Sequence, residues 1–201
     1  MLAAVNAEIL TIGDEICRGE IINTNASWLA TKLWEMDITT TWMSSCRDEP
    51  EDMAQAFTSA VKRAELVICT GGLGPTLDDR TCDVLAGLCN KEILIHEPSL
   101  AQMKEKYESR GRKLLPKSKR QVRTIESAST YLNPTGAAPG FSIGLNNAKV
   151  ICLPGPPSEL KAIFNTYLLD EIRELKRSKG CLLYTSPSPR DATLSRMPSS
   201  A

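Results

Sequence analysis

The segment Thr70-Gly71-Gly72-Leu73-Gly74-Pro75-Thr76-Leu77-Asp78-Asp79-Arg80-Thr81 decides the fold. It follows an apolar run, Leu66–Cys69, that is typical of a buried strand, and it precedes Cys82–Cys89, which is typical of a helix. Glycines at such a turn let the backbone approach a ligand with no Cβ in the way. Their N–H groups and the start of the next helix are suited to phosphate. The segment therefore predicts an α/β protein with a phosphate site, where two adjacent carboxylates would meet a divalent metal ion.

Strand-like and helix-like segments alternate along the chain. The predicted strands are Glu8–Ile12, Ile38–Met43, Leu66–Cys69, Glu92–Ile95 and Val150–Leu153, and the predicted helices cover 26–33, 50–64, 78–88, 98–110 and 157–175. This order favours a mostly parallel sheet with helices on both faces. Ligands bind to such sheets at the carboxyl ends of the strands. The loops at Gly13-Asp14-Glu15, at the glycine-rich turn and at Pro154-Gly155-Pro156 all follow predicted strands, so we expect them to form one site.

The composition excludes several classes of protein. The chain has 201 residues, enough for one α/β domain, and its 24 Lys and Arg balance its 24 Asp and Glu, which gives no bias toward nucleic acid. No apolar run reaches the roughly 18 residues of a membrane helix, and the first seven residues do not resemble a secretory signal. Seven cysteines without a C-x-x-C pair, beside a single histidine, favour free thiols over zinc or disulfides. A cytoplasmic protein that binds neither nucleic acid nor membrane is expected.

Other polar or small-residue segments have two interpretations each. Asp14 and Glu15 could hold a metal ion and Asn25 a ligand, or they could shape a turn and cap a helix. The loop Asn133–Phe141 could admit a ligand or form an ordinary Gly/Pro turn. For Glu159, pairing with the start of a helix is favoured over catalysis. Residues 104–123 hold nine Lys or Arg and two Glu, and a solvated surface is favoured over a flap that contacts anions.

The C-terminal segment departs from this pattern. Residues 181–201 contain three prolines and five serines without periodicity, and they resemble a recurrent translation of sequencing-adapter DNA. We therefore assign the domain to residues 1–176, predict a disordered tail over 177–201, and interpret 181–201 as non-native.

Five motifs in order resemble one family. They are T-I-G-D-E, G-E-I-I-N-T-N, G-G-L-G-P-T-L-D-D-R-T, N-P-T-G-A-A-P-G-F and L-P-G-P-P-S-E-L-K, within residues 6–175. Together they resemble the N-terminal domain of the competence/damage-inducible CinA proteins, part of the molybdopterin-binding superfamily of MoaB, MogA and MoeA. The resemblance implies a three-layer α/β/α fold and metal-dependent ADP-ribose pyrophosphatase activity, giving AMP and ribose 5-phosphate. Full-length CinA proteins also carry a nicotinamide-nucleotide amidase domain, to which the resemblance does not extend, so amidase activity is not expected of residues 6–175. A homodimer is compatible with this interpretation.

The resemblance also implies roles for individual residues. Asp79 matches the aspartate placed at the pyrophosphate and the metal, and Asp14 and Glu15 match paired acids after the first strand. Our leading hypothesis is a metal-assisted phosphoanhydride hydrolase that uses Mg²⁺, Mn²⁺ or Co²⁺. In it, Asp79 and Asp14 bind the metal, with Asp78 beside Asp79, and either Asp14 or Glu15 is a second ligand or the general base. The predicted substrate-binding residues are Gly71, Gly72, Gly74, Thr76, Asn25, Asn133, Gly136, Gly140 and Gly155.

Within that set, Gly71, Gly72 and Gly74 would hold a diphosphate through their N–H groups, and Asn133, Gly136 and Gly140 would line the nucleoside or ribose end. A capping role is favoured for Thr76. Two rival functions keep the same pocket. One is a molybdopterin- or nucleotide-binding domain with little or no hydrolysis, and the other is a non-catalytic regulatory module.

Overall fold

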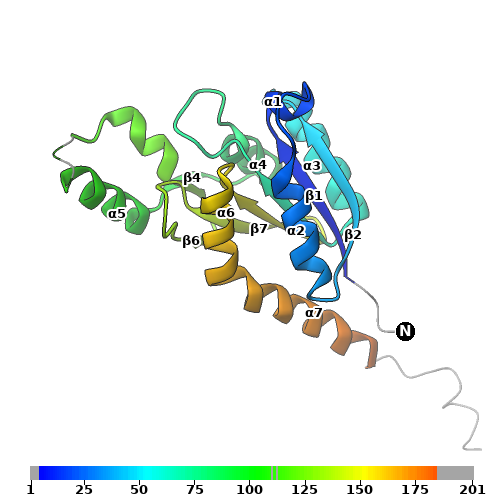
Figure 1. Cartoon of the computed structure of the whole chain (residues 1–201). Helices are drawn as coiled ribbons and strands as arrows, with labels where there is room; N and C mark the ends of the chain where they lie inside the picture. Colours follow the sequence, from blue (N-terminus) through cyan, green and yellow to red (C-terminus); the bar gives the residue numbers. More distant parts are fainter. Residues whose placement is uncertain (1–4, 110, 112, 185–201) are drawn as a thin grey trace, which may run out of the picture.

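The protein is described by a computed structural model over residues 5–109, 111 and 113–184. A central sheet of six strands has the order β2-β1-β3-β8-β7-β6 (Figure 1). Strands β2, β1, β3 and β8 are parallel, whereas β7 and β6 run antiparallel to their neighbours. The predicted mostly parallel sheet is confirmed. The strands are β1 (Asn6–Ile12), β2 (Thr39–Cys46), β3 (Leu66–Thr70), β6 (Ser129–Tyr131), β7 (Gly140–Leu145) and β8 (Ala148–Leu153).

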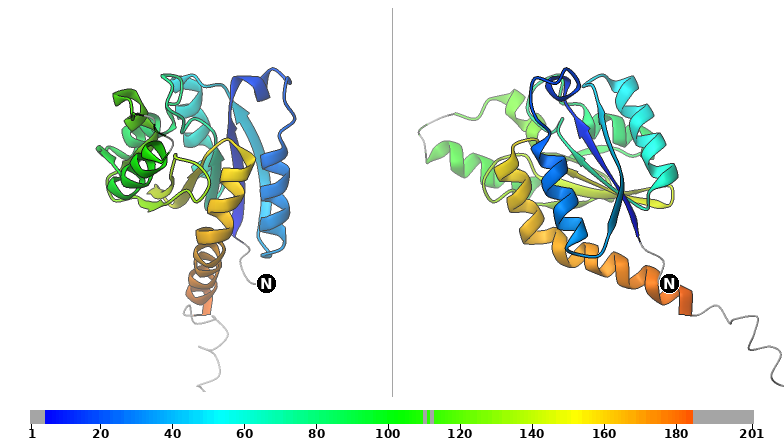
Figure 2. Two further views of the ribbon diagram at one scale, coloured as in Figure 1. Left: turned by 60° about the vertical axis from the view of Figure 1, so that its left-hand side comes forward. Right: turned by 45° about the vertical axis from the view of Figure 1, so that its right-hand side comes forward.

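Helices cover both faces of this sheet. One face packs against α2 (Thr24–Trp34), α6 (Pro157–Ile163), the π-helical turn η2 (Phe164–Leu168) and α7 (Leu169–Tyr184). The other packs against α3 (Pro50–Arg63) and α4 (Thr81–Cys89), and Figures 1 and 2 agree on this arrangement. The fold is a three-layer α/β/α sandwich, as predicted.

The central strands are apolar because both of their faces are covered. All five residues of β3 are buried, and they alternate between the two helical layers. Ile68 packs on the side of α2 and α6, whereas Val67 and Cys69 pack on the side of α3 and α4. Cys69 lies opposite Cys152 of β8 in the register of the sheet, and both side chains are fully buried.

The region between α4 and β6 differs from expectation. Strand β4 (Ile93–Ile95) exists where predicted, but it pairs antiparallel with β5 (Arg123–Ile125) outside the central sheet. Helix α5 (Glu97–Glu108) and the 3-10 turn η1 (Pro116–Val122) complete this lobe. Strands β5, β6 and β7 and the one-turn helix α1 (Asp14–Cys17) were not predicted. The strands β5 and β6 have three residues each, too few to show a period in the sequence.

The final helix is longer than predicted. The expected end at Leu175 and the expected disorder from residue 177 are both replaced by α7, which continues to Tyr184. Its sequence is rich in Leu, Glu, Lys and Arg, which have high helix propensity. The rest of the predicted tail, 185–201, lies outside the described residues. Within the described part of the chain, no helix has the length and apolar character required to cross a membrane.

Candidate functional site

A cleft of about 430 Å³ opens at the carboxyl ends of the parallel strands. Three loops line it: the turn after β1, the glycine-rich turn after β3 and the Pro154–Pro156 turn after β8. The predicted convergence of these loops is therefore observed. The lining side chains with ionisable groups are Glu15, Asp48, Asp78, Asp79 and Glu159.

The glycine-rich turn needs glycine for its backbone path. Gly71 has φ +108°, and a Cβ there would lie 2.2 Å from the carbonyl oxygen of Ile12. Gly72 has φ +66°, and a Cβ there would lie 2.2 Å from Oγ1 of Thr81. The N–H of Gly71 donates to the carbonyl of Leu153 at 3.1 Å. Gly71 therefore shapes the turn and ties it to β8, and its N–H is not available to a phosphate as the sequence predicted.

The N–H groups of the next three residues, unlike that of Gly71, are unpaired among the described residues. Among the described residues, no hydrogen-bond acceptor is found for the N–H groups of Gly72, Leu73 and Gly74, which all line the cleft. Consecutive unpaired N–H groups in a turn favour an anion. Gly72 and Gly74 therefore stay candidates for the predicted phosphate site, and Leu73 is a further candidate.

Asp79 organises the turn that carries it. Its Oδ2 accepts hydrogen bonds from the N–H of Thr76 at 2.8 Å and from the Thr76 hydroxyl at 2.5 Å. Both donors of Thr76 are therefore used inside the loop. The capping role favoured for Thr76 is wrong, because the N-cap of α4 is Arg80 and the Thr76 hydroxyl donates to Asp79 instead of accepting from the helix. Asp78 is exposed at the rim of the cleft, and Asp79 is half-buried within it.

The position of Asp14 differs from the prediction. Asp14 does not line the cleft, because its Oδ1 accepts from the N–H of Asp48 at 3.2 Å and its Oδ2 accepts from Arg18 at 2.6 Å. The N–H of Asp14 donates in return to Asp48 at 3.0 Å. Asp48 and Glu15 line the cleft instead. Asp48 follows β2, so the rule that ligands bind beyond strand ends could have found it.

Burial raises the pKa of the Asp48 carboxyl. The negative charges of Glu15, Asp14 and Asp79 raise it further, against the lowering effect of the Asp14 N–H. The carboxylates around the cleft thus repel one another, an arrangement that a cation would relieve. Among the described residues, no group of three or more His, Cys, Asp or Glu side chains is arranged to hold a metal ion. This donor set fits a cation such as Mg²⁺, which takes one or two carboxylates and completes its shell with phosphate oxygens and water.

Asn25 lies in a smaller hollow, of about 190 Å³, that adjoins the cleft at Glu15, Gly71 and Gly155. Its Nδ2 donates to the carbonyl of Gly155 at 2.7 Å and to Thr70 Oγ1 at 3.2 Å. Asn25 thus holds the loop after β8 against β3. Its buried Oδ1 has no hydrogen-bond partner among the described residues. Asn25 and Gly155 remain candidates for ligand contact.

The predicted ribose-end residues do not line the cleft. Asn133 is fully buried, and its Oδ1 accepts from the N–H groups of Thr135 at 3.1 Å and Gly136 at 2.7 Å. Gly140 begins β7, and a Cβ there would meet the core at 3.1–3.2 Å, so its role is in packing. Asn133, Gly136 and Gly140 therefore act within the protein. Glu159 lies in the first turn of α6, where the predicted pairing with the start of a helix places it, and it also lines the cleft.

The basic segment 104–123 supports the glycine-rich turn. Arg120 Nε donates to the carbonyl of Thr76 at 3.0 Å, and Nη2 donates to the carbonyl of Asp79 at 3.0 Å. Arg120 and Arg123 both pair with Asp83 of α4. These two arginines are therefore internal supports and not solvated or anion-binding groups.

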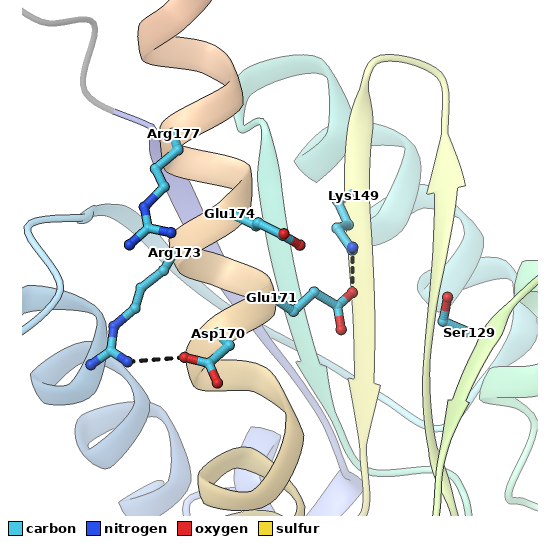
Figure 3. Close-up of a pocket in the computed structure, with 7 residues that line it drawn as sticks. All are labelled: Ser129, Lys149, Asp170, Glu171, Arg173, Glu174 and Arg177. Carbon is cyan, nitrogen blue, oxygen red and sulfur yellow. Dashed lines mark hydrogen bonds and ion pairs between the residues drawn. The ribbon is translucent and has the colours of Figure 1, made fainter.

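A larger hollow, of about 650 Å³, lies near the amino end of β8 and is drawn in Figure 3. Its charged side chains are largely paired with one another: Lys149 with Glu171, and Arg173 with Asp170 at 3.1 Å (Figure 3). It is open and lacks the glycine-rich backbone of the cleft. We therefore take the cleft at the carboxyl ends of the strands as the candidate functional site.

Comparison with known proteins agrees with the geometry. Residues 8–174 match the family described as "Probable molybdopterin binding domain". The chain belongs to this family. Within the molybdopterin-binding domain family it is CinA-like: a CinA-like protein of Dictyoglomus thermophilum is 39% identical over 165 residues, which cover 82% of this chain and 40% of that protein. The chain thus spans about two fifths of the length of this relative.

Solved structures give the same assignment. The structure of CinA from Thermoplasma acidophilum has a TM-score of 0.75 at 33% identity and covers 83% of this chain and 98% of that one. The molybdopterin biosynthesis enzyme MoaB from Thermus thermophilus has a TM-score of 0.59 at 19% identity and covers 87% of this chain and 97% of that one. The second similarity shows that the CinA-like chain shares the MoaB fold.

Proposed function

We propose that this domain binds a nucleoside diphosphate compound in the cleft and hydrolyses its phosphoanhydride bond with the aid of a divalent metal ion. The proposed substrate is ADP-ribose, which water would split into AMP and ribose 5-phosphate. One observation carries the proposal: Gly72, Leu73 and Gly74, whose N–H groups have no acceptor among the described residues, line the same cleft as Glu15, Asp48 and Asp79. The N–H groups favour phosphate, and the carboxylates favour the cation that accompanies it.

The chain's own residues have distinct roles in this proposal. The N–H groups of the turn bind and orient the diphosphate. One or two of the carboxylates of Asp79, Asp48 and Glu15 would hold Mg²⁺, Mn²⁺ or Co²⁺, and Asp48 takes the place of the predicted Asp14. The metal ion, when bound, would neutralise phosphate charge and lower the pKa of a water molecule. Glu15, if it is not a ligand, is the candidate to accept the proton of that water on a carboxylate oxygen.

The test is hydrolysis of ADP-ribose with each metal ion, measured as release of AMP. We expect turnover that EDTA abolishes and that Asp79→Asn and Asp48→Asn reduce by about a hundredfold or more, because both variants keep the loop hydrogen bonds but lose the charge. Asp170→Asn, an exposed change on α7, is the matched control and should retain wild-type turnover. Turnover that persists in Asp79→Asn would contradict the metal assignment.

The family match supports a second candidate function. A molybdopterin or nucleotide could bind in the same cleft with little or no hydrolysis. Retained binding of ADP-ribose or of a pterin phosphate, with no turnover under any metal ion, would select this alternative over the hydrolase. Under either function we propose a cytoplasmic protein, because Cys17, Cys46, Cys69, Cys82, Cys89 and Cys152 are free thiols.

A further inference from the structure

The loop before β7 and the start of α6 meet at the side chain of Glu159. Asn133 belongs to the loop before β7, and Glu159 lies in the first turn of α6. The Nδ2 of Asn133 donates to Oε2 of Glu159 at 2.6 Å. Glu159 lines the cleft, whereas Asn133 lies behind it and is fully buried. A buried amide therefore holds one oxygen of a carboxylate that faces the ligand space.

The orientation of the Asn133 amide follows from its neighbours. Its oxygen accepts from two backbone N–H groups, of Thr135 and Gly136, which can only donate. Its Nδ2 also donates to the carbonyl of Ala138 at 2.8 Å, which can only accept. Every hydrogen-bonding atom of this side chain is thus assigned, and the donor that reaches Glu159 cannot exchange places with the acceptor. The carboxylate is held in one position.

Gly136 leaves the room that this position needs. A Cβ at Gly136 would lie 2.0 Å from Oε2 of Glu159 and 2.6 Å from Nδ2 of Asn133. The loop is fixed from its other side by Lys106, whose Nζ donates to the carbonyl of Gly136 at 2.6 Å. Glycine is therefore needed at position 136 to leave space for the Glu159 carboxylate, which an ordinary turn would not require.

The chemistry of a carboxylate limits what it can recognise. An ionised carboxylate only accepts hydrogen bonds, and Glu159 Oε1 has no partner among the described residues. Phosphate would be repelled, so the Glu159 side of the cleft fits a neutral part of the ligand that carries donors. We propose that Glu159 determines specificity by accepting hydrogen bonds from ribose hydroxyl groups, and that Asn133 and Gly136 are its positioning residues. This inference rests on the proposed binding of a ribose diphosphate compound.

The test compares ADP-ribose with analogues that lack one hydroxyl group on either ribose, using calorimetric Kd values for wild type and Glu159→Gln with Mg²⁺ present. In wild type, loss of the contacted hydroxyl should weaken binding by roughly tenfold to a hundredfold, as expected for a hydrogen bond to a charged group. In Glu159→Gln the same loss should change Kd by less than about threefold. Gly136→Ala should behave like Glu159→Gln, because its methyl group would displace the carboxylate.

Matched controls separate this role from a general effect on folding. Gly144→Ala has open space around the added Cβ, and Glu174→Gln lies on α7, so both should keep the wild-type discrimination between analogues. If Gly136→Ala fails to fold, Glu159→Gln decides the question alone, since glutamine still accepts from Asn133.

The outcomes distinguish this inference from the proposed function. If wild type does not bind ADP-ribose, the proposed function fails and this inference fails with it. If ADP-ribose binds but the hydroxyl penalty is equal in wild type and Glu159→Gln, this inference alone is overturned. A loss of turnover in Glu159→Gln with unchanged Kd for every analogue would also overturn it, since Glu159 would then act on the reacting atoms.

Discussion

The guanidinium group of Arg120 donates a hydrogen bond from Nη2 to the backbone carbonyl of Asp79 at 3.0 Å. Nε of the same side chain binds the carbonyl of Thr76, and Nη2 also contacts Asp83 of α4. One side chain from η1 therefore holds the segment between Thr76 and Asp79 at two points and joins it to a core helix. The conformation of the proposed phosphate site depends on a residue that lies outside the central sheet.

Replacing this arginine should loosen the turn. We expect Arg120→Ala to reduce the free energy of unfolding by about 1–2 kcal/mol and to increase hydrogen exchange at residues 72–80, because three hydrogen bonds are lost. Arg47→Ala, which removes an exposed ion pair with Asp52, is the control and should leave exchange in the turn unchanged. Equal hydrogen exchange at residues 72–80 in Arg120→Ala and wild type would show that the turn keeps its conformation without Arg120.

A side chain at Gly71 should be poorly tolerated. Gly71→Ala forces a strained φ of +108° and places Cβ 2.2 Å from a backbone oxygen that cannot easily move. We expect a loss of about 2–4 kcal/mol of stability in denaturant unfolding. Gly87→Ala in α4 meets no atom within 4 Å and should be neutral or slightly stabilising. A wild-type midpoint for Gly71→Ala would mean that the turn has another conformation.

Asp48 should couple the stability of the protein to divalent cations. Its raised pKa means that its ionised form is disfavoured in the folded state by burial and by the charges of Glu15, Asp14 and Asp79. We expect Mn²⁺ to raise the melting temperature of wild type more than that of Asp48→Asn, and we expect Asp48→Asn to melt higher than wild type in EDTA. Differential scanning fluorimetry measures both. The same Mn²⁺ shift in both proteins would remove Asp48 from the proposed metal site.

Glu171 should make the stability of the folded protein depend on pH. Burial acts to raise the pKa of Glu171, but hydrogen bonds from Lys149 and Tyr131 outweigh it and lower the pKa below its usual value of 4.5. A lowered carboxyl pKa gives stability that is present above the unfolded pKa and is lost as pH falls through the folded pKa. The melting temperature should therefore fall on acidification below about pH 4.5.

Replacing Glu171 isolates its contribution to the pH dependence of stability. Glu171→Gln should flatten the acid slope without abolishing it, because Arg123 and Arg120 also lower the pKa of Asp83 against the effect of its burial. Glu174→Gln on the same helix is the control and should keep the full slope. If Glu171→Gln and wild type lose stability equally on acidification, the network around Glu171 makes no net contribution.

The sequence predicted the parts of the fold whose residues carry a strong local pattern. The fully apolar Leu66–Cys69 and the periodic 50–64 segment gave β3 and α3 within a residue or two. Strand β7 was missed because Gly140 and Gly144 interrupt its apolar pattern, and a glycine in a strand removes the side chain that marks its face. Strand β4 was found but placed in the wrong sheet, because its partner β5 is thirty residues away along the chain.

The sequence predicted the position of the candidate site in the fold, but only some of the residues that line it. The rule for strand ends correctly brought Glu15, Asp79 and Gly155 together. It could not separate Asp14 from Glu15, since adjacent residues of α1 point in different directions and only the pairing with Arg18 and Asp48 shows which one turns away. Asn133 and Gly136 were wrongly predicted to line the ribose end, because the hydrogen bond from Asn133 to Glu159 spans 26 positions and exists only in three dimensions.

The facing thiols of Cys69 and Cys152 have a practical consequence. Burial raises the pKa of the Cys69 thiol well above its usual range, and contact with Cys152 raises it further. Both side chains are fully buried, so a reagent reaches neither thiol while β3 and β8 stay paired under their helices. Cys17, in contrast, is exposed on α1. The rate at which a thiol reagent labels the buried pair therefore measures how often the core opens, and the labelling of exposed Cys17 under the same conditions gives the reference rate.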